Sequence, residues 1–223
     1  MSVNQQFSVP EQSGAVDALL GDYAAGSLPL PVFVMVAAHL EMTAVNRRFV
    51  AGLEHSLACE MDCSVSDTVP LKRAARLESI FGETGKDIIQ VRPAVADEIL
   101  PASLAAYIGI PFSEIRWKRS LMGIKEHTIE VRDGREVSLL WIKAGRKMPS
   151  HTHLGSEMTL VLKGSFTDRA GQYLPGSISV ADSDVDHKPV IDAGSDCICF
   201  VVTDAPLRLT GPVGKFVSRF FGH

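Results

Sequence analysis

The chain has 223 residues, 46% of them hydrophobic, and carries 22 Lys and Arg against 26 Asp and Glu, a net charge of −4. Such a length can bury one large core or two modest ones, since domains usually have about 100 to 150 residues. Residues 1–90 hold six Lys and Arg against 11 Asp and Glu, a net charge of −5. Phosphate would repel this acidic part, so we expect no direct binding to nucleic acid.

The apolar segments and the cysteines favour a cytoplasmic location over a membrane or secreted one. The longest apolar stretch, residues 28–38, is interrupted by two prolines and is too short to span a bilayer, and no cleavable leader is recognisable. The four cysteines, Cys59, Cys63, Cys197 and Cys199, are too few for a disulfide scaffold. We therefore expect a cytoplasmic protein without membrane association.

The first part of the chain has helical periodicity. Apolar residues at helical spacing predict helices over residues 16–25, 31–41, 45–61 and 71–81, and Pro31 suits the first turn of the second helix. A module of about 80 residues has a small core. We therefore expect some helical faces to be completed by a partner or a metal.

The second part of the chain is rich in strand-forming residues. Residues 82–101 mix charges, Gly and Pro and predict a linker, with a domain boundary near residue 95. Short strand-like runs separated by glycine turns then follow at 115–118, 128–132, 137–142, 158–162, 178–181 and 197–202. The pattern predicts a two-domain α+β protein, with a small helical bundle and linker over 1–95 and an antiparallel β-barrel over 96–223.

A group of metal-binding residue types lies inside the predicted barrel. His151, His153 and Glu157 are two and four residues apart, and alternate residues of a strand share one face, so the three can converge on one ion. His187 is the expected fourth ligand. Imidazole and carboxylate donors suit Zn, Fe, Mn or Ni, and we expect one divalent metal in this domain.

Cys197 and Cys199 flank Ile198, so both thiols are expected on one side of a strand, facing the metal cavity. They are candidate sensor residues, which would require thiolate character. The alternative is that both are small buried hydrophobic residues. Alternate residues of one strand are poor partners for a disulfide bond with each other.

The spacing of the metal-binding residues resembles a known motif. The first cupin motif is matched at its defining positions by Gly145-x5-His151-x-His153-x3-Glu157-x6-Gly164. Pro175-Gly176 followed by His187 resembles the second motif more loosely, since Gly176 and His187 are eleven apart and the usual Asn is missing. The resemblance implies a double-stranded β-helix, with His187 as the least secure ligand.

A wider resemblance covers nearly the whole chain. Residues 16–28, 38–40 and 196–208 resemble ChrR-type anti-sigma factors. This implies a transcription regulator whose helical domain sequesters an extracytoplasmic-function (ECF) sigma factor and whose cupin domain, containing zinc, responds to oxidative signals such as singlet oxygen.

The chain departs from that family at its helical zinc site. Zinc-binding anti-sigma domains carry a His-x3-Cys-x2-Cys motif and a further upstream His. Here His39 is present, but Thr43 and Asn46 occupy the cysteine positions and Gly14 the upstream position. One imidazole cannot hold structural zinc, which needs four donors, so we expect no zinc in the helical domain and a polar helix-end role for His39.

Another set of donors occurs in the third predicted helix. His55, Cys59 and Cys63 lie one helical turn apart and form an alternative candidate site, although this spacing is ordinary for a helix face.

Three functions are compatible with the sequence, and we favour the regulatory one. The alternative is a metal-dependent cupin enzyme, dioxygenase-like or an isomerase-like hydrolase, with the helices as an oligomerisation cap and Asp184 or Asp186 as a base. A third is a storage or scaffold role. Barrels of this type support many unrelated activities, so the fold alone does not decide, and the oligomeric state is left open.

Overall fold

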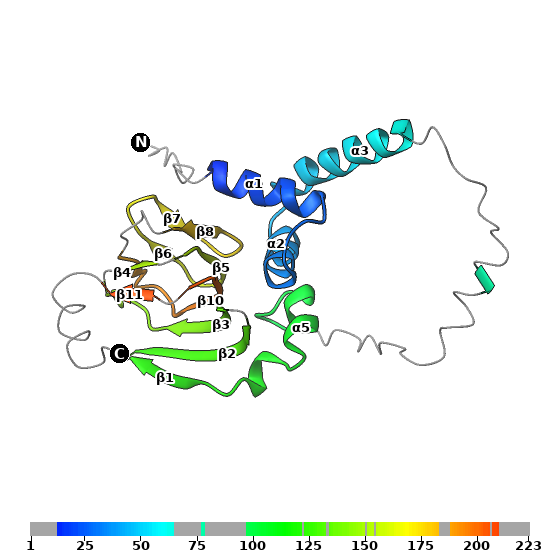
Figure 1. The fold of residues 1–223 in the computed structure, drawn as a ribbon. Coiled ribbons are helices and arrows are strands. Elements are labelled where there is room, and N and C mark those ends of the chain that lie inside the picture. Colours follow the sequence, from blue (N-terminus) through cyan, green and yellow to red (C-terminus); the bar gives the residue numbers. More distant parts are fainter. Residues whose placement is uncertain are drawn as a thin grey trace.

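The computed structural model describes residues 13–64, 77–78, 97–121, 123–132, 134–149, 151–153, 155–182, 188–205 and 207–209. Helices come first and strands second, so the predicted α+β organisation is confirmed (Figure 1). Within these ranges no helix combines the length and the apolar character needed to cross a membrane.

The first three predicted helices are present, with ends that differ by a few residues. They are α1 (Ser13–Ala24), α2 (Leu30–Met42) and α3 (Arg47–Ser64). Proline occupies the first turn of α2, where its missing N–H has no helical partner to lose. Only residues 77–78 of the fourth predicted helix lie within the described residues.

A further helix, α5 (Ala102–Ile108), packs against α2 and was not predicted from the sequence. The chain enters it through a turn held by the carboxylate of Asp97, which accepts backbone N–H bonds from Ile99, Leu100 and Phe112. Burial alone would raise the pKa of Asp97, but these three N–H donors outweigh it and lower the pKa. The last residues of the predicted linker are therefore held by hydrogen bonds to residues on both sides of α5.

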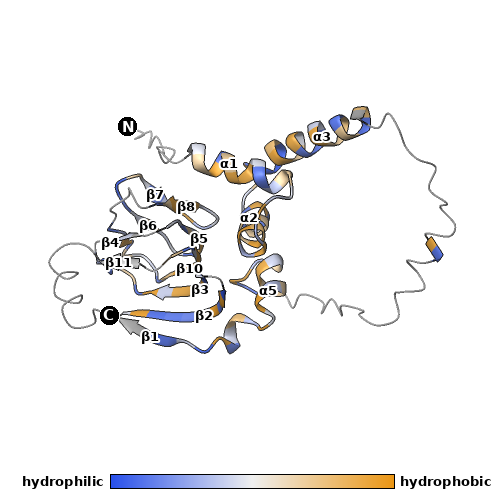
Figure 2. Ribbon diagram, in the orientation of Figure 1, coloured by the Kyte–Doolittle hydropathy of each residue, from blue (hydrophilic) through white to orange (hydrophobic). Residues whose placement is uncertain are grey.

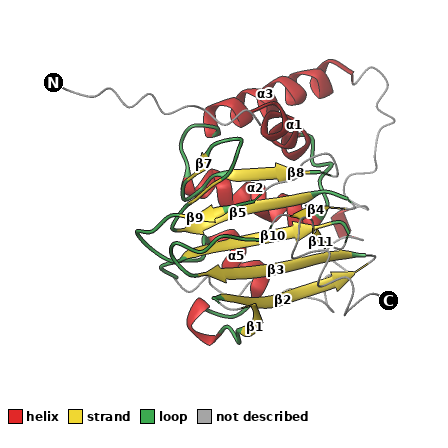
Figure 3. Cartoon of the chain, turned by 90° about the vertical axis from the view of Figure 1, so that its left-hand side faces the viewer, coloured by secondary structure: helices red, strands yellow, loops and turns green. Residues whose placement is uncertain are grey.

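The strands form three antiparallel sheets (Figure 3). The largest has the order β1-β2-β3-β10-β5-β8, and the smaller ones are β7-β6-β9 and β11-β4. Their bounds are β1 Lys118–Leu121, β2 Ile124–Arg132, β3 Arg135–Ile142, β4 His151–His153, β5 Glu157–Lys163, β6 Phe166–Thr167, β7 Gln172–Tyr173, β8 Ile178–Ala181, β9 Val190–Ile191, β10 Cys197–Thr203 and β11 Leu207–Leu209. The predicted antiparallel β architecture is confirmed.

The first predicted strand, residues 115–118, was misplaced. The chain forms a 3-10 turn, η1 (Phe112–Glu114), and the strand begins only at Lys118. The physical reason is packing, because Ile115 is buried beneath the helices and the ring of Trp117 contacts the rings of Phe112 and Trp141. The apolar character of this segment serves the core between helices and sheet.

Strand β10 separates two hydrophobic cores. Ile198, Phe200 and Val202 belong to a core shared by the outer face of the large sheet and the helices α1, α2, α3 and α5. Cys197 and Cys199 belong to a second core inside the barrel. Since both faces of β10 are covered, the strand is apolar at successive positions instead of alternating. The helices and the barrel are thus packed together through a common core.

Candidate functional site

His39, in the last turn of α2, connects the helices to the barrel. Its side chain is 5% exposed, and its Nδ1 lies 2.6 Å from the carbonyl oxygen of Gly176, which precedes β8. A carbonyl can only accept, so Nδ1 carries the proton and donates. Nε2 is then an acceptor, and it receives a hydrogen bond of 2.9 Å from the side-chain amide of Asn46. Both ring nitrogens of a neutral imidazole are therefore satisfied.

The turn that carries the accepting carbonyl requires glycine. Gly176 has φ +87°, and a Cβ there would lie 2.5 Å from the Thr43 Cγ2 and 3.2 Å from the Met42 Cβ. Its N–H donates to the carbonyl of Val161 in β5, which holds the turn on the sheet. We call His39, Thr43, Asn46 and Gly176 the junction.

Three residues of the junction stand at positions where the resembled family carries helical zinc ligands, namely His39, Thr43 and Asn46. Asn46 stands at a cysteine position and bonds the His39 ring, while Thr43 stands at the other and packs on Gly176. Burial lowers the pKa of His39, although the hydrogen bond to the Gly176 carbonyl partly offsets this. The sequence singled out His39 as a polar helix-end residue, but it did not reveal its burial or its partner in the barrel.

Two of the predicted metal ligands, His151 and His153, lie in the short strand β4, which pairs with β11. Their side chains lie outside what the structure describes. His187 falls in residues 183–187, which also lie outside the described residues. The same segment holds Asp184 and Asp186, which the alternative enzyme would use. The convergence of the three histidines therefore stays a prediction.

Glu157, the third residue of the predicted ligand set in chain order, is described and half-buried at the start of β5. It lies opposite Thr203 of β10 and Ala181 of β8, and its carboxylate accepts a hydrogen bond of 3.3 Å from the Thr159 hydroxyl. Its negative charge also acts on the thiol of Cys199 inside the barrel. A half-buried carboxylate facing the interior is a fitting donor for a divalent metal.

The two candidate sensor thiols lie inside the barrel. Cys197 and Cys199 are buried, and their Sγ atoms are 3.5 Å apart, on the same side of β10 as predicted. The hydrogen bond with Cys197 and burial raise the pKa of the Cys199 thiol well above its ordinary value, and the negative charge of Glu157 raises it further. All three effects oppose formation of the Cys199 thiolate. Without a nearby cation, Cys199 therefore has the properties of an inert buried thiol.

The alternative donor set on α3 does not come together. The Sγ of Cys59 lies 3.8 Å from Nε2 of His55, and Cys59 and Cys63 are exposed. Among the side chains that the structure describes, including these three, no group of three metal-binding residues occurs.

One face of α3 is apolar and partly exposed to solvent. Phe49, Leu57 and Met61 are 47%, 38% and 70% exposed, and their spacing of four or eight residues places them along one side of the helix. Only Val50, near the start of α3, is buried in the shared core. Figure 2 shows hydrophobic positions along this helix, which extends away from the barrel.

The arrangement defines a class of two-part proteins in which a small helical module is fixed on a cupin barrel. Residues 106–206 match the family model of the ChrR cupin-like domain. The chain is 35% identical over 207 residues to the anti-sigma-E factor ChrR of Cereibacter sphaeroides. This match covers 92% of this chain and 95% of the relative. This chain therefore belongs to the ChrR family of anti-sigma factors.

A solved structure supports the same relationship over both parts. The crystal structure of Rhodobacter sphaeroides SigE in complex with the anti-sigma ChrR matches with a TM-score of 0.68 and 32% sequence identity. The match covers 84% of this chain and 96% of the matched chain. The similarity thus extends through the helices as well as the barrel.

Proposed function

We propose that this chain is an anti-sigma factor that sequesters an ECF sigma factor, with the apolar face of α3 as part of the contact surface. The relative named above is an anti-sigma factor, and the matched solved structure is a complex of SigE with the anti-sigma ChrR. The observation in this chain that carries the proposal is the exposure of Phe49, Leu57 and Met61. Because a sigma factor acts on RNA polymerase, the proposal places the activity in the cytoplasm.

The energetics of α3 favour a bound partner. Fully burying one large apolar side chain contributes about 1.5–3 kcal/mol, so covering three half-exposed ones offers several kcal/mol. An extended apolar patch on a monomer is typical of an interaction site. The net charge of −5 over residues 1–90 also complements a basic surface, as expected for a partner that itself binds nucleic acid.

Co-purification tests the sequestration. When the chain is expressed with the ECF sigma factor encoded beside it, a 1:1 complex is expected to survive gel filtration. Phe49→Asp should weaken that complex about 100-fold, because a carboxylate replaces an apolar contact at the interface. Ala51→Asp is the matched control, since it adds the same charge at an exposed position two residues further along α3 and should leave the complex intact. Equal affinity of both variants would contradict the role of this face.

We propose further that the barrel holds one divalent metal, zinc in preference to iron, manganese or nickel, through His151, His153, Glu157 and His187. The half-buried carboxylate of Glu157, on the side of the barrel interior that holds Cys199, supports this assignment. A bound divalent ion would supply positive charge to this interior and favour the thiolate of a neighbouring cysteine. Such a charge would oppose the rise in the pKa of Cys199.

Elemental analysis tests the metal site. The parent protein should contain about one metal ion per chain, and His151→Ala and His153→Ala should each lose most of it, because each removes a donor that bonds directly to the ion. The control is His127→Ala, whose ring is hydrogen-bonded to the Arg116 carbonyl and lies outside the ligand set. Full metal retention in both ligand variants would refute the assignment.

The same site is proposed to sense an oxidative signal. Glu157→Ala is then expected to keep the sigma complex but to blunt its release by singlet oxygen or peroxide, since binding and sensing reside in different parts of the chain. Release that persists unchanged in Glu157→Ala and in the Cys197→Ser/Cys199→Ser double variant would exclude the barrel interior as the sensor.

A further inference from the structure

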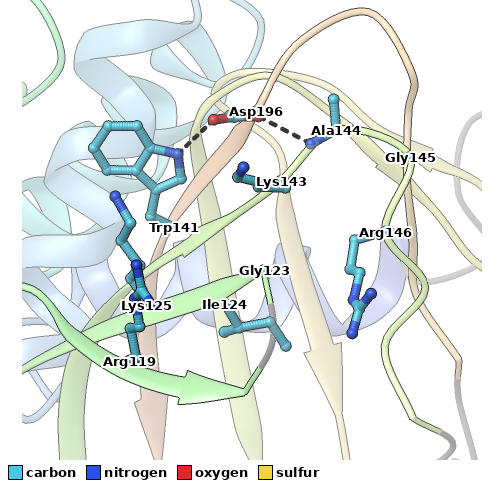
Figure 4. Close-up of a pocket in the computed structure, with 10 residues that line it drawn as sticks. All are labelled: Arg119, Gly123, Ile124, Lys125, Trp141, Lys143, Ala144, Gly145, Arg146 and Asp196. Carbon is cyan, nitrogen blue, oxygen red and sulfur yellow. Dashed lines mark hydrogen bonds between the residues drawn. The ribbon is translucent and has the colours of Figure 1, made fainter.

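A groove rich in positive charge lies at the end of the barrel opposite to Glu157. Glu157 pairs with Thr203 at one end of β10, whereas the groove lies beside Ile142 and Cys197 at the other. It has a volume of about 860 Å³. Four basic side chains line it together with Trp141 and Asp196, namely Arg119, Lys125, Lys143 and Arg146 (Figure 4). We refer to it as the basic groove.

The frame of the basic groove is held by hydrogen bonds. The backbone N–H of Lys143, just after β3, donates to the carbonyl of Gly123 in the turn between β1 and β2. The carboxylate of Asp196 accepts a bond of 2.8 Å from the Trp141 indole N–H and one of 3.0 Å from the Ala144 N–H. These bonds join three separate chain segments, so the walls exist before any ligand arrives.

The basic groove has an excess of positive charge. The N–H groups of Ala144 and Trp141 lower the pKa of Asp196, which stays ionised, but they also occupy its oxygens. No ion pair within 4.0 Å joins any of the four basic side chains to a carboxylate in the part of the chain that the structure describes. The net charge of the lining is therefore +3, because Asp196 is its single acidic residue.

The positions of the four basic groups are suited to an anion. Lys125 is held over the Trp141 ring, with its Nζ 4.3 Å from the ring centroid, and Figure 4 shows Arg119 beside it. Lys143 and Arg146 come from the segment that follows β3, and Figure 4 shows Arg146 across Ile124 from Arg119, with Lys143 between them. Arginine side chains can donate two parallel hydrogen bonds to a phosphate or a carboxylate.

We propose that the basic groove binds a small anion with two or more negative charges, carried by phosphate or carboxylate groups. Its volume falls within the range of about 300–1,000 Å³ found for small-molecule sites. A multivalent anion would relieve the mutual repulsion of the four cations, which one charge would do only in part. The gathering of the charges in one concavity, rather than along an extended face, favours a small ligand over an acidic polypeptide.

Trp141 provides the measurement. Trp141 lines the groove, and its indole N–H donates to Asp196, which also lines it. Trp117, the second tryptophan of the chain, does not line the groove. Titration of the full chain at low ionic strength with inorganic phosphate, and separately with succinate, should produce a saturable shift of the Trp141 indole NMR signal. The Trp117 signal should move less. Comparison of the two titrations distinguishes phosphate from carboxylate ligands.

Charge-neutral variants decide whether the groove is the binding site. Arg146→Gln and Arg119→Gln should each raise the dissociation constant about tenfold, as expected for the loss of one charged donor. The matched control Arg169→Gln removes an exposed arginine outside the groove and should leave the constant unchanged. The proposal is overturned if neither phosphate nor succinate gives a saturable shift of the Trp141 signal. It is also overturned if the dissociation constants of all three variants change alike, or if a glutamate-rich peptide binds and the two small anions do not.

Discussion

Replacing His39 by alanine is expected to lower the free energy of unfolding by about 3 kcal/mol. The substitution leaves the buried carbonyl of Gly176 without its donor, which costs about 1–3 kcal/mol, and it opens a cavity between α2 and the barrel. Urea denaturation measures the change. The control is His127→Ala, because His127 also bonds a backbone carbonyl but is only half-buried and its hydrogen bond is exposed, so its loss should cost less than about 1 kcal/mol. Equal losses would show that the junction does not stabilise the fold.

The same histidine predicts a pH dependence. Burial lowers the pKa of His39 in the folded protein below the ordinary value of 6.5 that it has when unfolded. Above that value both states are neutral and the contribution of His39 is fully present. As the pH falls below 6.5 the unfolded state gains a proton first, so stability is lost until the pH reaches the lowered folded pKa.

A conservative variant isolates this effect. His39→Asn keeps an N–H donor near the position of Nδ1 and has no titratable group, so its stability should depend less on pH between about pH 7 and pH 5 than that of the parent. When the unfolding free energy of each protein is plotted against pH, the difference between the two plots removes the contributions of the other titrating groups. Parallel pH profiles would contradict the assignment of the lowered pKa to His39.

Gly164→Ala is expected to destabilise the barrel by about 4 kcal/mol. Gly164 has φ +73°, and a Cβ there would overlap the carbonyl oxygen of Asp196 and lie 2.9 Å from the Cys197 Cα. These are backbone atoms of β10 and the turn before it, so the clash cannot be relieved by rotating a side chain. Strain at the left-handed conformation adds about 1–2 kcal/mol.

Gly145→Ala is the matched control, because the two glycines are the first and last residues of the same motif and differ in what surrounds them. Gly145 has φ +69° but no atom within 4 Å of an added Cβ, so only the conformational strain applies. Thermal or urea denaturation of both variants should show a clearly larger loss for Gly164→Ala. If both lose the same stability, the close contact with β10 is not the cause.

Local patterns in the sequence were enough to predict most of the elements. Apolar spacing predicted α1, α2 and α3, and alternation with glycine turns predicted the longer strands, since both signals arise from residues close together in the chain. The spacing from Gly145 to Gly164 and three further segments were enough to identify the family, which the comparisons confirm. The helix α5 escaped prediction because it has only seven residues, and its position depends on packing against α2 and on the Asp97 turn before it rather than on a periodic pattern.

The tertiary structure alone decided what the distinctive residues contact. The sequence determined that His39 lacks its zinc-binding companions, but the partner of its ring is a backbone carbonyl 137 residues away, and a carbonyl leaves no signature in the sequence. The basic groove likewise combines Arg119, Lys125 and Arg146 from separate segments around one aspartate. The physical reason is common to both, because a hydrogen bond or a shared cavity between distant segments depends on how whole elements pack and not on the order of residues within any one of them.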